Sequence, residues 1–169
     1  MRNFRTNKVY LVFQFIISVL LIVLAALNGN GDNKTNAALL YIMVAVSLVI
    51  FVSSAVRKVS VTEDNVFIIR NMFKSVKIEL ERIKYGYALS AMGRYVIIIN
   101  DGKKSAMISS LISGFIHLER LIASKIGDEE RGSFDIITEK SLKMKSAAYM
   151  CFMLLITALI LFAILKSLE

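Results

Sequence analysis

Residues 61–83 read VTEDNVFIIRNMFKSVKIELERI, and this stretch has the pattern of antiparallel β structure. The turn-forming residues at 63–65 lead into a run of β-branched and aromatic residues at 66–73. A Lys-Ser turn follows, and apolar residues then alternate with charged ones over residues 76–81. Because polar and apolar residues also alternate over residues 58–62, the pattern predicts three strands joined by short turns.

The β pattern continues beyond this stretch. Residues 85–90 and 94–100 read as further strands, and Asp-Gly at 101–102 is a strong hairpin signal before a strand at 105–109. The sequence therefore predicts a small antiparallel β domain of about six or seven strands with one C-terminal capping helix. This amphipathic helix is expected over residues 111–126, where one helical face carries Leu111, Phe115, Leu118, Ile122 and Ile126.

Three long apolar runs flank this domain in the sequence. Residues 9–27, 37–56 and 146–165 contain no charged residue over 19 or 20 positions each. A helix rises about 1.5 Å per residue, so each run is long enough to cross a hydrocarbon core of about 30 Å. The first run exceeds the 7–15 apolar residues of a typical signal peptide, which favours a retained helix. The sequence thus predicts a membrane protein with three transmembrane α-helices.

These patterns divide the chain into four segments. An N-terminal transmembrane hairpin is expected over residues 1–56, with a Gly/Asn-rich turn at 28–36. The β domain follows at 57–126, an acidic linker at 127–145, and the C-terminal transmembrane helix at 146–169.

The distribution of lysine and arginine predicts the orientation. Three of these residues precede the first run, one lies in the turn, and sixteen lie in residues 57–145. By the positive-inside rule, the N-terminus and the β domain are cytoplasmic, and the C-terminus lies outside the plasma membrane. This explanation also accounts for the net charge of +8 without nucleic acid as a partner, because the sequence carries no recognised nucleic-acid module.

The β segment resembles the bacterial pleckstrin-homology-like (PH-like) domains. In that family, a strand pattern v-t-e/d-x-x-v/l-i-i-r is followed by a second hairpin and an l-x-x-I turn. The matching residues here are VTEDNVFIIR at 61–70 and LERI at 80–83. The resemblance covers roughly residues 57–126, and family members are often anchored by a pair of helices before the domain. It implies no phosphoinositide site, because the bacterial domains often depart from inositide binding.

The residues that usually carry enzyme chemistry are sparse. The one histidine, His117, falls on the polar face of the expected helix, and the one cysteine, Cys151, lies in the third apolar run. The carboxylates at Glu79 and Glu81 and at residues 128–130 read as solvated surface. Metal-ligand spacing and a Gly-rich phosphate loop are absent from the sequence. We expect neither enzyme activity nor a cofactor.

The basic residues are the remaining candidates for a site. Contact with anionic lipid head groups is predicted for residues next to the apolar runs: Arg57, Lys58, Lys140, Lys143 and Lys145. A basic face of the β domain is predicted from Arg70, Lys74, Lys77 and Lys84. The alternative is that these residues are topology signals and ordinary solvated surface.

Three functional hypotheses follow. The first is a binding or scaffold module that presents an interaction surface at the inner leaflet to an unidentified membrane or cytoplasmic protein, with spans that could also form a homo-oligomer. The second is an accessory membrane protein that protects against membrane-active peptides, as some bacterial relatives of the PH-like class do. The third is a holin-like or pore protein. Carrier function is disfavoured because the apolar runs contain no ionisable residues except Cys151 and tyrosines.

Overall fold

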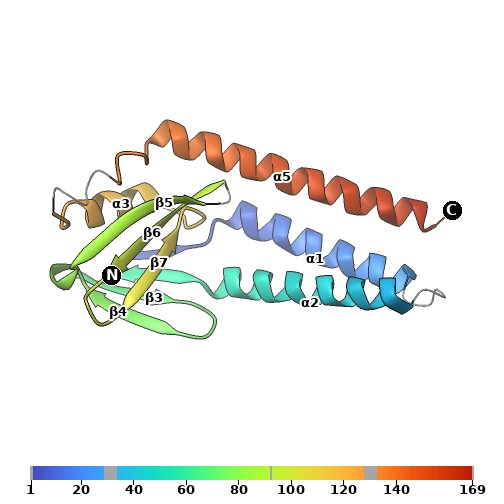
Figure 1. The fold of residues 1–169 in the computed structure, drawn as a ribbon, viewed down its shortest axis with the longest axis horizontal. Coiled ribbons are helices and arrows are strands. Elements are labelled where there is room, and N and C mark those ends of the chain that lie inside the picture. The colour runs from blue at the N-terminus through green and yellow to red at the C-terminus, as the bar shows by residue number, and fades with distance from the viewer. Residues whose placement is uncertain (1, 29–33, 92, 128–132, 169) are drawn as a thin grey trace. The chain divides into compact units, whose positions relative to one another are not determined.

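The computed structural model describes residues 2–28, 34–91, 93–127 and 133–168 (Figure 1). The chain forms two compact units. One, here called the β unit, comprises Met1–Asn7 and Val56–Tyr149, and the other, the helical unit, comprises Lys8–Ala55 and Met150–Glu169.

The β unit contains two small antiparallel sheets and a helix that follows them (Figure 1). The four-stranded sheet has the order β1-β2-β3-β4, with strands Arg2–Arg5, Lys58–Val61, Val66–Arg70 and Ser75–Glu79. A short 3-10 helix, η1, leads on to the other sheet and covers Leu80–Arg82. The three-stranded sheet has the order β5-β6-β7, with strands Tyr85–Ala91, Arg94–Asn100 and Ser105–Ser109. The prediction of a small antiparallel β domain with a C-terminal helix is confirmed.

Strand β1 is the element that the sequence did not predict. It pairs with β2 from Arg2 opposite Val61 to Arg5 opposite Lys58, and the Ser60 hydroxyl donates to Asn3 Oδ1 at 2.8 Å. The segment predicted as a single hairpin at residues 1–56 therefore begins with a strand of the β unit. Only one of its four residues is apolar, so it has no alternation that could reveal it.

The hydrophobic core is formed by the inward faces of both sheets and by α3, Phe115–Ala123. Buried residues alternate with exposed ones along β4 and with partly exposed ones along β6, as the period of a strand with one face in the core requires. The largest side chains with less than 2% exposure are Phe67, Phe115, Ile69, Ile78, Leu80, Ile97, Ile99, Ile108, Leu118 and Ile122. All of these come from strands, η1 or the helix face that the alternating and helical patterns indicate.

Helix α3 is shorter than the predicted 111–126. Its N-cap is Gly114, with φ +73°, a conformation that a side chain disfavours. A Cβ atom at this position would also lie 2.8 Å from Cδ1 of Phe4 on β1. The glycine thus permits both the start of the helix and the close approach of the N-terminal strand.

The predicted linker at 127–145 is partly folded. Residues 128–132, which include the predicted acidic cluster, lie outside the described residues. Phe134 and Ile137 are buried in the core of the β unit. Thr138 and Ser141 then exchange side-chain to backbone hydrogen bonds of 2.9 and 3.1 Å, which cap the start of α5. Helix α5 covers Glu139–Lys166 and so begins seven positions before the predicted third apolar run.

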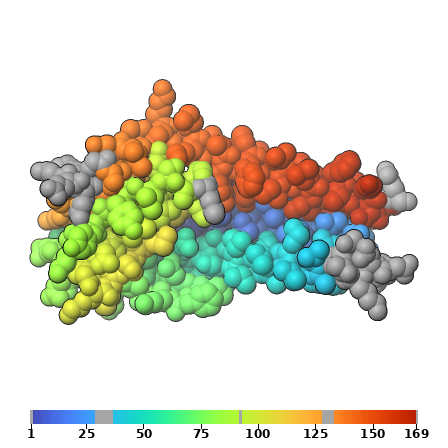
Figure 2. All heavy atoms as spheres, viewed as in Figure 1, coloured from blue at the N-terminus to red at the C-terminus, as the bar shows by residue number. Residues whose placement is uncertain are grey.

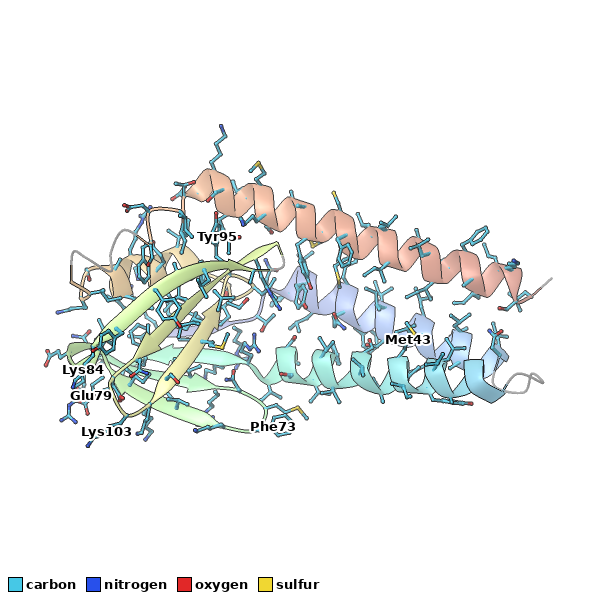
Figure 3. All side chains as sticks on the ribbon, viewed as in Figure 1. Met43, Phe73, Glu79, Lys84, Tyr95 and Lys103 are labelled. Carbon is cyan, nitrogen blue, oxygen red and sulfur yellow. The ribbon has the colours of Figure 1, made fainter. Side chains whose placement is uncertain are left out.

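Among the described residues, three helices are long and apolar enough to cross a membrane, namely α1 (Lys8–Asn28), α2 (Lys34–Val56) and α5. Within the helical unit, α1 and α2 share a buried hydrogen bond of 2.8 Å between the Ser18 and Ser47 hydroxyls. Many apolar side chains of α2 are exposed, and Met43 is one example (Figure 3). Such exposure suits a lipid environment. Residues 29–33 of the predicted turn lie outside the described residues.

Candidate functional site

An exposed apolar surface lies on the outward side of the three-stranded sheet. The register aligns Tyr87 with Ile98 and Ile98 with Met107, so one apolar row crosses all three strands. A shorter row joins Leu89 to Val96. We call this surface the apolar face and define it as Tyr85, Tyr87, Leu89, Val96, Ile98 and Met107.

The side chains of the apolar face are large and accessible. Tyr85 is 57% exposed, Tyr87 43%, Leu89 45% and Met107 57%. In Figure 2 the yellow-green and yellow side chains of β5, β6 and β7 form part of the viewed surface. Contiguous exposed apolar patches on folded domains usually mark interaction surfaces, and tyrosine and methionine are enriched in protein interfaces.

Strand β5 turns its large residues outward because small residues occupy its inward positions. A Cβ atom on Gly86 would lie 2.1 Å from Cδ1 of Ile126, and Ala88 is only 4% exposed. Ile126 and Phe134 already fill the space beneath β5, so no larger inward side chain fits there. The sequence predicts a strand at this position, whereas the apolar face becomes visible only in the structure. The alternation of small and large residues in YGYAL was the available signal.

Three of the four residues predicted as a basic face lie together. Arg70 and Lys77 are on β3 and β4, and Lys74 lies in the turn between these strands. Lys84 lies apart from them, at the end of the β unit that also carries Glu79 and Lys103 (Figure 3). Its aliphatic chain lies beside Gly102, where an added Cβ would be 3.1 Å from Cδ of Lys84. The predicted basic face is therefore a cluster on the β3–β4 hairpin without Lys84.

The predicted juxtamembrane residues occupy different environments. Lys58 pairs in register with Arg5 and with Arg70, so three cationic residues cross the four-stranded sheet in one row. Lys145 contacts the β unit itself: its Nζ lies 4.5 Å from the centroid of the Tyr95 ring and bonds to the Ser90 hydroxyl. Arg57 directly precedes β2. Lys140 and Lys143 are exposed in the first turns of α5.

An open cleft of about 630 Å³ contains residues of both charges. Arg82 Nε forms an ion pair with Glu79 Oε2 at 2.8 Å, and the cleft also contains Asp101 and Lys104. The backbone N–H groups of Lys103 and Lys104 donate to Asp101 and lower the pKa of its carboxyl. The charged residues that line the cleft are the cations Lys77, Arg82, Lys103 and Lys104 and the carboxylates Asp64, Glu79 and Asp101. This mixed charge does not define a binding site for an anion.

The one histidine is exposed, as predicted. Its Nε2 lies 2.9 Å from Nη1 of Arg2, and its ring centroid lies 6.2 Å from that of Phe4. His117 therefore helps to hold β1 against α3, which is a structural role. In the part of the chain that the structure describes, no three histidine, cysteine or acidic residues are grouped in a way that could hold a metal ion.

Glu119 on α3 is only 8% exposed, and the helical pattern did not predict its burial. Burial raises the pKa of this carboxyl, with a smaller opposing effect from Arg120 and a reinforcing one from Asp135. A raised folded-state pKa means that the fold favours the protonated form. The stability that protonated Glu119 contributes is therefore fully present below its unfolded-state pKa, and it is lost as the pH rises through its folded-state pKa.

Replacing Glu119 with glutamine is expected to raise the thermal stability of the β unit at neutral pH, because it removes a buried negative charge. The difference should vanish below about pH 4, where glutamate is protonated in both states. Thermal unfolding of both proteins across this pH range measures the effect. An equal difference at all pH values would show that the charge is not the cause. Glu81→Gln is the matched control, because the Glu81 side chain in η1 is exposed.

No protein-family model, curated protein or solved structure matches this chain. Its function is therefore inferred from its own residues.

Proposed function

We propose that this protein is a membrane-anchored, non-enzymatic binding module of PH-like fold that recruits a second protein through the apolar face. In this proposal, α1, α2 and α5 cross the plasma membrane. The N-terminus and the β unit lie in the cytoplasm, and the C-terminus lies outside. The length and apolar composition of the three helices support membrane insertion, and the lysine and arginine distribution supports the orientation.

The arrangement of the β unit supports the PH-like part of the proposal. The six strands β2 to β7 lie in two antiparallel sheets and are followed by α3, which is the order expected from the resemblance over residues 57–126, whereas β1 was not expected. The motif residues also have structural roles. Residues 61–70 form the end of β2, the turn and β3, and Leu80 of the LERI turn is 1% exposed in the core.

The single observation that carries the functional proposal is the apolar row Tyr87–Ile98–Met107, in which Tyr87 and Met107 are exposed and Ile98 is partly exposed. Covering such a side chain recovers part of the roughly 1.5–3 kcal/mol that its burial from full exposure would give. A protein partner that covers them recovers this free energy, whereas a polar small molecule does not. The face is also uncharged along its central row, so lipid head groups are poor ligands for it.

The direct test is to purify the tagged full-length protein from its native membrane in mild detergent after chemical cross-linking, and to identify bound proteins by mass spectrometry. We expect a stoichiometric second protein. Recovery of the chain alone, or only with copies of itself, would contradict recruitment of a different protein.

The orientation gives a separate prediction. Cys151 is the only cysteine, so a Cys151→Ser background allows single cysteines to be placed at will. A membrane-impermeant maleimide should label Ser167→Cys in intact cells but label Ser105→Cys only after the cells are permeabilised. Both parent serines are exposed, so differences in labelling report the side of the membrane. The reverse labelling pattern would invert the proposed topology.

A further inference from the structure

The turn between β3 and β4 exposes an unusual apolar side chain. Phe73 is 86% exposed, the highest value for any large apolar residue outside the three long helices in the part of the chain that the structure describes. Its neighbour Met72 is 37% exposed. The turn is closed by a hydrogen bond of 2.9 Å from the Asn71 N–H to the Lys74 carbonyl, so Phe73 is held at the tip of an ordered hairpin.

The strand register shows which end of the sheet carries this turn. Arg5, Lys58, Arg70 and Ser75 form one row across β1 to β4. The turn begins directly after Arg70. In Figure 3, Phe73 lies at the opposite end of the β unit from Glu79, Lys84 and Lys103.

The same end of the sheet connects to the apolar helices. From Arg5 the chain reaches the start of α1 at Lys8, and α2 ends at Val56, two positions before Lys58. Three residues span at most about 10 Å, and neighbouring strands lie about 4.8 Å apart. If α1 and α2 cross a membrane, the β3–β4 turn is therefore confined by the covalent chain to the vicinity of the bilayer surface.

The residues beside Phe73 suit that location. Arg70 and Lys74 are exposed on either side of Met72 and Phe73, and Lys77 lies further along β4. An apolar tip flanked by cations matches an interface in which acyl chains lie beneath anionic phosphates. If the turn faced only water, the exposed Phe73 side chain would have no apolar surroundings to stabilise it.

We propose that the β3–β4 turn is an additional membrane contact. Phe73 inserts into the head-group boundary of the leaflet that α1 and α2 enter, and Arg70 and Lys74 bind the phosphates of anionic lipids. This contact orients the β unit on the bilayer, so that the apolar face is presented in a fixed direction. The inference rests on the proposed membrane insertion of the helices.

The test uses the absence of tryptophan from the chain, which makes each introduced tryptophan a single reporter. Three full-length variants are reconstituted into vesicles of phosphatidylcholine and phosphatidylglycerol, with or without brominated acyl chains that quench nearby tryptophan. Phe73→Trp reports the turn, Phe152→Trp reports the apolar part of α5, and Tyr85→Trp reports the opposite end of the β unit.

We expect bromination to quench the emission of Phe73→Trp and Phe152→Trp strongly and to leave that of Tyr85→Trp unchanged. Adding Arg70→Gln and Lys74→Gln to Phe73→Trp should reduce its quenching in these vesicles. With these two substitutions, the quenching should no longer change with the proportion of phosphatidylglycerol in the vesicles. Quenching of Phe152→Trp without quenching of Phe73→Trp would overturn this inference alone and leave the turn available to a protein. Loss of quenching at both positions would instead refute membrane insertion and with it the proposed function.

Discussion

Replacing Phe67 with alanine is expected to destabilise the β unit strongly, whereas replacing Phe73 with alanine is expected to leave its stability unchanged. The two phenylalanines lie only six positions apart, on β3 and in the turn that follows it. Phe67 is 0% exposed at the centre of the core, and Phe73 is 86% exposed. Both substitutions remove the same side chain, one from a buried position and one from an exposed position.

The expected magnitudes follow from the cavity that each substitution leaves. A buried phenylalanine cut back to alanine costs about 3–5 kcal/mol, which is a large part of the 5–15 kcal/mol that stabilises a typical domain. A substitution at an exposed position usually stays within about 0.5 kcal/mol. Because the helical unit can remain folded in detergent, the measurement must report on the β unit alone.

Limited trypsin digestion supplies that measurement, since the β unit carries many lysine and arginine residues between Arg57 and Lys145. Phe67→Ala should be cleaved within this region at temperatures at which the parent protein and Phe73→Ala resist cleavage. Equal protection of all three proteins would show that Phe67 does not anchor the core.

The strands from β2 to β7 could be predicted because each lies in a local β pattern. Some, such as β2 and β4, alternate polar and apolar residues, and others, such as β3 and β6, are runs of β-branched and aromatic residues bounded by turns. The three long helices could also be predicted, because their length and lack of charge are local properties. Strand β1 could not be predicted, because RNFR contains a single apolar residue and its partner β2 lies more than 50 positions away in the sequence. Its pairing is a tertiary effect, which local propensity does not determine.

The candidate site was harder to predict than the fold, since it depends on which way each side chain points. Alternation in YGYAL is compatible with either face of β5 inward. Ile126 and Phe134 decide the direction, because they leave room only for Gly86 and Ala88. The position of Lys145 beside Tyr95 likewise depends on where α5 begins, which the Thr138 and Ser141 cap determines.

The pairing of Arg5 with Lys58 brings together the two points at which the chain leaves the β unit for α1 and returns from α2. The helices α1 and α2 are inserted between two strands that are hydrogen-bonded neighbours. Both chain connections of this helical pair therefore leave the β unit from adjacent strand ends rather than through a single flexible tether.

Replacing Tyr87 with aspartate is expected to abolish partner recruitment without unfolding the β unit. Tyr87 lies in the row of the apolar face that crosses all three strands, opposite Ile98 and between Tyr85 and Leu89 along β5. Aromatic residues at the centre of protein interfaces commonly contribute 2 kcal/mol or more, which corresponds to a loss of affinity of about 30-fold. An introduced carboxylate adds the cost of burying a charge, so the expected loss is larger still.

Recovery of the cross-linked partner from Tyr87→Asp and parent membranes measures this effect, with trypsin resistance as the check that the β unit remains folded. Ile136→Asp is the matched control, since it places the same charge at an apolar position of the β unit that is similarly exposed and lies outside the apolar face. If Tyr87→Asp loses the partner and Ile136→Asp retains it, the apolar face is the protein-binding surface. Retention of the partner by Tyr87→Asp would contradict the proposed role of the apolar face.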